Sequence, residues 1–275
     1  YTSQLSRNVK PLPMPDLFQQ ASYCLAAADP DDKLRRTRAI REAWLLGDLT
    51  LDRNTAPEPI GEPGRPTRPD LVHPSKVRTR KLGSRTGRAA FLHALAHIEF
   101  NAINLALDAV YRFQDMPQQY YTDWIRVAAE EADHFTMLSD YLTKHGVSYG
   151  DMPAHNGLWE MAVKTDQDVL VRMALVPRVL EARGLDVTPT MIEKLQPTGD
   201  TELITALKKI FDEEAWKHNV YLLYDDMIKR LAVQQDRLFG TVKIDRCFNS
   251  MGSILNRSRR LFFNSHRTRS IVNKL

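Results

Sequence analysis

Cysteine is scarce in this chain of 275 residues, which contains only Cys24 and Cys247. The two lie far apart and form no CxxC pair, so the sequence predicts neither a disulfide framework nor a cysteine zinc site. Two free thiols suit a reducing compartment, and we expect a soluble protein of the cytoplasm or the mitochondrial matrix. Long hydrophobic runs are also lacking, because no stretch of eighteen apolar residues occurs; this argues against a transmembrane helix. The sequence begins with Tyr1 rather than Met, so it says nothing about a targeting segment.

Charge is unevenly distributed along the chain, although the net charge is only +4. Residues 64–88 and residues 243–275 each hold eight Lys or Arg and one acid, so each segment carries +7 and the remainder carries −10. This pattern fits RNA or another phosphate-rich partner, and it equally fits solvated basic tails without a specific partner. The candidate RNA contacts are Arg78, Arg80, Lys81, Arg257, Arg259, Arg260, Arg267 and Arg269.

Hydrophobic periodicity predicts an all-α protein, and the 43% hydrophobic content can supply its core. Residues 29–49 read as a capped helix that ends near Gly47. Residues 55–76 contain six prolines, which forbid a continuous helix and predict an extended arm. Four long helical patterns follow, at residues 84–113, 117–145, 158–183 with a bend at Pro177, and 201–231.

Four helices of this length favour a four-helix bundle. We therefore divide the chain into an N-terminal helical region (1–54), a Pro-rich basic arm (55–83), a bundle (84–233) and a basic C-terminal extension (234–275).

Each of the four helices places one carboxylate inside its apolar stripe when its residues are plotted at 100° intervals. The inward polar positions are Glu99, Glu131, His134, Glu181 and Glu214. Glu213 is predicted to point elsewhere, roughly beside Lys209 and Ala206. Four buried carboxylates require a compensating positive charge, because each ion taken out of water costs several kcal/mol. A pair of iron or manganese ions, held by lone Glu residues and by Glu-x-x-His pairs, is the best-attested solution in a helical bundle.

The runs "RKLGSRTGRAAFLHALAHIEFNAINLALDAVYRF", "DWIRVAAEEADHF", "YGDMPAHNGLWEMA" and "LVPRVLEARGLDVTPTMIEKL" resemble a ferritin-like domain family of unknown function. The distant relatives of that family include the di-iron tRNA hydroxylase. The similarity covers about residues 65–224. It implies a ferritin-like four-helix bundle with a carboxylate-bridged di-metal centre, whose ligands fall on the five positions given above.

The chain departs from this family at one ligand. The last segment of the family has the form Asp-Glu-x-x-His, whereas this sequence has "EEAWKH", with Lys217 at the expected histidine and His218 one residue later. Three arrangements follow. His218 takes the ligand role after a local shift of the helix. Alternatively, a single metal ion is held by Glu99, Glu131 and His134, with or without Glu181. In the third arrangement the Lys217 ammonium replaces the charge of the metal.

The function depends on which arrangement holds. An intact centre predicts an O2-dependent hydroxylase or oxidase, with an organic substrate that the sequence does not identify. A lost centre predicts a non-catalytic scaffold or assembly protein in an RNA–protein complex such as an organelle ribosome, acting through its basic segments.

Overall fold

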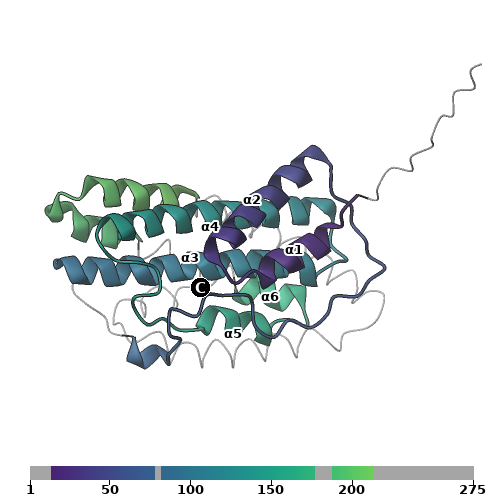
Figure 1. Cartoon of the computed structure of the whole chain (residues 1–275), viewed down its shortest axis with the longest axis horizontal. Helices are drawn as coiled ribbons and strands as arrows, with labels where there is room; N and C mark the ends of the chain where they lie inside the picture. The colour runs from purple at the N-terminus through teal and green to yellow at the C-terminus, as the bar shows by residue number, and fades with distance from the viewer. Residues whose placement is uncertain (1–13, 78–81, 177–187, 214–275) are drawn as a thin grey trace, which may run out of the picture. The chain divides into compact units, whose positions relative to one another are not determined.

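The computed structural model describes residues 14–77, 82–176 and 188–213. These residues are mostly helical and contain no strand, which confirms the all-α prediction at that level (Figure 1). The chain divides into two compact units, residues 1–219 and 220–275, and every described residue belongs to the first.

Two long helices, α3 (Arg85–Arg112) and α4 (Gln118–Lys144), pack against each other along their length. The Ser84 hydroxyl caps α3 by accepting a hydrogen bond from the Gly87 amide at 3.0 Å. Pro117 precedes α4, and Gly146, with φ +75°, follows its end. Both helices therefore match the sequence prediction to within a residue or two.

The N-terminal helices α1 (Leu17–Ala26) and α2 (Pro30–Leu46) cover this pair, with α1 against α3 and α2 against α4. Asp29 caps α2, and Gly47 ends it with φ 78°, a left-handed conformation that favours glycine. The predicted helix within residues 29–49 is confirmed. Its basic face also reaches α4, because Arg38 forms an ion pair with Asp133 at 2.9 Å.

The described part of the Pro-rich arm, residues 55–77 and 82–83, contains no helix apart from the single 3-10 turn η1 (Pro74–Lys76). Several hydrogen bonds join its backbone to the rest of the fold; among them, the Gly64 amide donates to the Leu25 carbonyl at 2.8 Å, and the Val72 amide donates to the Ala154 carbonyl at 2.8 Å. A Cβ atom at Gly64 would lie 2.1 Å from the Ala26 carbonyl oxygen, so only glycine permits this close approach. Hydrogen bonds thus hold this segment against the residue Leu25 of α1 and the loop residue Ala154.

The prediction of one continuous helix from residue 158 to Pro177 is wrong. The structure has two short helices, α5 (Gly157–Lys164) and α6 (Val169–Leu175), separated at residues 165–168, well before the bend predicted at Pro177. The Thr165 hydroxyl donates to the Met161 carbonyl at 2.8 Å, and the Asp168 side chain accepts from the Val171 amide at 3.3 Å. These side-chain bonds compete with continuous helix, which is why the polar run ends one helix and starts the next.

Residues 188–195 and 201–213 are also helical. The second of these segments and the residue before it contact α4, since the Tyr141 hydroxyl bonds to Asp200 and Lys144 pairs with Glu202 at 2.5 Å. The predicted helix 201–231 is described only as far as residue 213.

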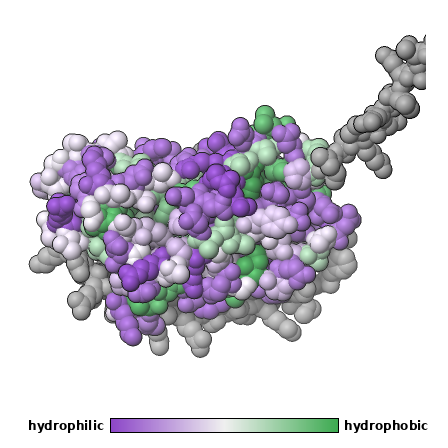
Figure 2. All heavy atoms as spheres, viewed as in Figure 1, coloured by the Kyte–Doolittle hydropathy of each residue, from purple (hydrophilic) through white to green (hydrophobic). Residues whose placement is uncertain are grey.

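One described helix, α3, is long and apolar enough to cross a membrane by length and composition, but 67% of the window concerned is buried inside the protein. It is the central core helix of the described fold. On the face drawn in Figure 2, hydrophilic side chains predominate and hydrophobic ones form separate patches.

Candidate metal centre

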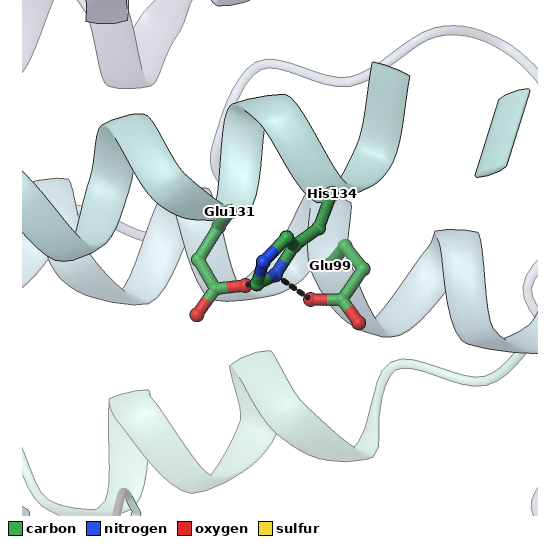
Figure 3. Close-up of side chains that lie close together, drawn as sticks. All are labelled: Glu99, Glu131 and His134. Atoms are coloured by element: carbon green, nitrogen blue, oxygen red, sulfur yellow. Dashed lines mark hydrogen bonds and ion pairs between the residues drawn. The ribbon is translucent and has the colours of Figure 1, made fainter. Parts of the chain in front are cut away.

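Glu99 on α3 meets Glu131 and His134 on α4 in the interior (Figure 3). Glu131 and His134 stand three residues apart, so both side chains leave the same face of α4. One ligand atom from each of the three residues lies within 4.8 Å of the others. The sequence placed all three in apolar stripes, and the structure brings them together.

Burial of this group is nearly complete. Glu99 is 5% exposed, Glu131 is 3% exposed and His134 is 0% exposed. The Nδ1 atom of His134 lies 3.2 Å from Glu131 Oε2 and 3.7 Å from Glu99 Oε2. Two carboxylates therefore face the same imidazole nitrogen away from bulk water.

The electrostatics of the group favour a bound cation. Burial, followed by the neighbouring Glu131 charge, raises the pKa of Glu99 to about 8. Burial alone would lower the pKa of His134, but its hydrogen bonds with Glu131 and Glu99 raise it to about 11. The metal-free group therefore retains protons. A cation would replace those protons, because metal binding releases them from its ligands.

Glu213 also contacts His134, and this corrects the sequence prediction. Its Oε2 atom lies 2.5 Å from His134 Nε2, while its other carboxylate oxygen lies 4.0 Å from the Lys209 ammonium. The prediction placed Glu213 beside Lys209 but away from the core. A position at the edge of the inward face suffices for contact, because the glutamate side chain is long enough to reach the imidazole from there.

The contact with Glu213 orients the imidazole. A carboxylate accepts, so Nε2 carries a proton and donates it to Glu213, and a bound metal ion would replace the proton on Nδ1. In metal sites the ring nitrogen that is not a ligand usually donates to a carboxylate or carbonyl in this way. The other nitrogen, Nδ1, is the one that faces Glu99 and Glu131. His134 is thus arranged as a histidine ligand would be, with Nδ1 turned toward the carboxylates.

The remaining predicted site residues lie outside the described residues. They are Glu181, Glu214, Lys217 and His218. The same holds for all the candidate RNA contacts, which are Arg78, Arg80, Lys81, Arg257, Arg259, Arg260, Arg267 and Arg269.

A second buried ionic cluster was not predicted from the sequence. Asp108 on α3 is 0% exposed and lies 2.5 Å from the guanidinium of Arg172 on α6, which is 1% exposed. Arg112 also pairs with Asp108, at 2.6 Å. Asp108 stands on the opposite side of α3 from the apolar stripe that contains Glu99, and its arginine partner comes from a distant helix, so the helical period gave no signal for this cluster.

The two histidines near Glu99 in sequence have structural roles. The His93 Nε2 atom accepts a hydrogen bond from the Gly150 amide at 2.9 Å. His97 bonds through Nδ1 to the Tyr149 hydroxyl at 2.9 Å and through Nε2 to the His155 carbonyl at 3.1 Å. These hydrogen bonds join α3 to residues 149–155.

The described structure thus defines an all-α protein with a buried carboxylate and imidazole group that could hold a metal ion. The chain belongs to the family described as "Protein of unknown function (DUF455)", whose model matches residues 26–219. An "Uncharacterized protein" of Haemophilus influenzae (strain ATCC 51907 / DSM 11121 / KW20 / Rd) is 42% identical over 207 residues, covering 72% of each chain. No solved structure matches.

Proposed function

We propose that this chain is a ferritin-like protein that binds metal in its helical bundle, and that Glu99, Glu131 and His134 are ligands. The observation that carries the proposal is their burial within 4.8 Å of one another, from two helices packed side by side. A buried group with two carboxylates and one histidine is costly without a cation and is a good donor set with one.

Glu181 and Glu214 would complete a two-ion centre, by the resemblance described above. Glu213, the last described residue of its segment, contacts His134, so this segment reaches the proposed ligands. Iron or manganese is the metal that such a carboxylate-rich bundle site takes.

The residues of the chain would act by holding and orienting. Glu99 and Glu131 supply the carboxylate oxygens, His134 supplies Nδ1, and Glu213 holds the His134 Nε2 proton. Burial excludes water from all three ligands. Two ferrous ions bound there would supply O2 activation, so hydroxylation or oxidation of an organic molecule is the proposed reaction class.

Metal analysis of the full chain, purified with iron or manganese supplied, tests the proposal. We expect about two ions per chain if His218 or an equivalent completes the site, and one ion if only one position is held. The affinity of the Glu131→Gln variant for metal should be at least about tenfold lower than that of the wild type. The matched control is Glu130→Gln, which changes the adjacent carboxylate, paired with Arg126 at 2.7 Å and outside the ligand group.

A folded wild-type chain that binds no metal would overturn the proposal and favour the alternative, a scaffold protein. Salt-dependent binding to structured RNA in a filter assay is the expected property of that alternative, because phosphate contacts release counterions.

A further inference from the structure

Tyr149 follows α4 in the chain, and its ring packs against the residues next in sequence to two proposed metal ligands. The ring centre lies 4.9 Å from that of Phe135 and 5.7 Å from that of Phe100. Phe135 follows His134 and Phe100 follows Glu99, so each pair of neighbours has Cα atoms about 3.8 Å apart. A single layer of side chains thus connects the Tyr149 ring to the elements that carry these ligands.

The hydroxyl of Tyr149 has a base as its hydrogen-bond partner, because it lies 2.9 Å from Nδ1 of His97. The other ring nitrogen, Nε2, lies 3.1 Å from the His155 carbonyl, which can only accept, so Nε2 carries the proton. The Asn101 amide nitrogen also lies 3.1 Å from Nε2, but it donates to the His97 backbone carbonyl at 2.8 Å. Nδ1 therefore has a free lone pair and accepts the hydrogen bond from the phenol.

The loop around Tyr149 is fixed to the same helix that carries this base. His93 stands one turn before His97 on α3, and its Nε2 accepts from the amide of Gly150, the residue after Tyr149, at 2.9 Å. Gly150 has φ +106°, a conformation that favours glycine. The phenol ring is inclined by only 26° to the His93 ring and 25° to the His97 ring. The hydrogen bond between Tyr149 and His97 is therefore held in position before any reaction.

A base at this place changes what the phenol can do. Burial raises the pKa of Tyr149, so its hydroxyl keeps the proton at neutral pH. A phenol that loses an electron becomes a strong acid, so the loss is far easier when a neighbouring base takes the proton at the same time. By contrast, the Tyr121 hydroxyl donates to the Phe113 carbonyl at 3.0 Å, and a carbonyl is too weak a base for this role.

We propose that Tyr149 and His97 form a redox-active pair that supplies one electron to the metal centre, an inference that rests on the proposed function. The Tyr149 ring loses one electron to the centre after O2 has oxidised it. The phenol O–H bond breaks at the same time, and its proton moves to His97 Nδ1. The products are a neutral tyrosyl radical and an imidazolium that donates to the Tyr149 oxygen and to the His155 carbonyl. One electron and one proton leave the tyrosine, so its charge does not change.

Electron paramagnetic resonance tests the pair in the full chain. The protein is loaded with ferrous iron in the absence of oxygen, mixed with O2 and frozen at successive times. We expect the signal of a tyrosyl radical, with a hyperfine pattern that changes when the protein is grown with ring-deuterated tyrosine. Tyr149→Phe should lose the signal while binding as much iron as the wild type.

Tyr141→Phe is the matched control for the loss of the signal. The Tyr141 hydroxyl also donates to a base, the Asp200 carboxylate, but its ring stacks on His145 at the end of α4. We expect this variant to form the radical as the wild type does. A signal that Tyr141→Phe loses and Tyr149→Phe keeps would overturn the assignment.

The role of His97 has a readout that needs no variant. Wild-type protein prepared in D2O should show an exchangeable deuteron coupled to the radical, donated by the His97 imidazolium. The His97→Gln variant removes the base and should form the radical more slowly. A radical without the exchangeable deuteron would show that His97 does not take the proton.

The iron content separates the two ways in which the inference can fail. A folded chain that binds no iron overturns the proposed function and this inference with it. A chain that binds iron and oxidises it with O2, yet forms no radical that depends on Tyr149, overturns this inference alone.

Discussion

Two buried carboxylates of α3, Glu99 and Asp108, have opposite electrostatic surroundings. Asp108 lies against two guanidinium groups, those of Arg172 at 2.5 Å and Arg112 at 2.6 Å. Glu99 has only the His134 imidazole within ion-pair distance among the described residues, at 3.7 Å, and shares it with Glu131. The same helix thus carries one acid with ample cationic partners and one with too few.

The difference separates a structural cluster from a candidate site. The Asp108 cluster is closed, because its arginines bring more positive charge than the carboxylate needs, and it attaches α6 to α3. The Glu99 group has fewer cationic partners than acids, so it must hold protons or bind another cation. Buried acids on their own are therefore poor indicators of a metal site, and the number of neighbouring cations is the better one.

Removing a guanidinium from the closed cluster should give the largest effect. Arg172→Met leaves the Asp108 charge with Arg112 alone and also removes the bond from Arg172 to the Ala162 carbonyl at 2.6 Å. We expect the free energy of unfolding, measured with urea, to fall by about 3–5 kcal/mol.

The double variant Asp108→Leu/Arg172→Met is the control for that loss, since it removes both charges and should recover most of the stability. If the free energy of unfolding of Arg172→Met lies within about 1 kcal/mol of the wild-type value, Arg172 does not stabilise the Asp108 charge in the way described above.

Removing a carboxylate from the Glu99 group should have the opposite effect: it should raise the free energy of unfolding of metal-free protein. Glu99→Gln takes away an acid whose pKa is raised to about 8 by burial and by Glu131. We expect metal-free protein to gain about 1–3 kcal/mol at pH 8 in urea unfolding, because ionising this buried acid costs stability. The same variant should lose metal when ions are supplied.

The pH dependence of this gain follows from the direction of the shift. The ordinary pKa of a glutamate, 4.5, applies in the unfolded chain, whereas burial and Glu131 raise the pKa of Glu99 to about 8 in the folded protein. Folded protein therefore binds the extra proton between these values, and its stability falls as pH rises through them. The advantage of the glutamine variant should be absent below about pH 4.5, grow up to about pH 8 and then level off. An advantage that does not change with pH would rule out this cause.

Helix positions were predictable from the sequence because they depend on local signals. Ser84, Asp29 and Gly47 mark the ends of α3 and α2 through side-chain caps and a left-handed glycine, which act within a few residues. The break at residues 165–168 was missed, although its Thr and Asp side chains are also local. Apolar periodicity on both sides was given more weight than these competing side-chain bonds.

The sequence predicts which residues of the candidate site face inward, but it does not predict which side chains they contact. Periodicity placed Glu99, Glu131 and His134 on inward faces, because burial repeats with the helical turn. It could not show that Glu213 reaches His134 or that Arg172 reaches Asp108, since both contacts join helices distant in sequence. Side-chain reach and helix packing decide such pairs, and neither has a sequence period.

Changing Glu213 should give a smaller effect and define its role. Glu213→Gln keeps the size of the side chain but weakens the hydrogen bond to His134 Nε2, so the imidazole is held less firmly. We expect cobalt(II) titration of the full chain, followed by its visible absorption, to show about tenfold weaker binding with unchanged stoichiometry. Lys209→Gln is the matched control: the lysine side chain is 55% exposed and its ammonium lies 4.0 Å from Glu213, so its removal should leave the affinity nearly unchanged. A loss of one bound ion per chain in Glu213→Gln would instead make Glu213 a ligand itself.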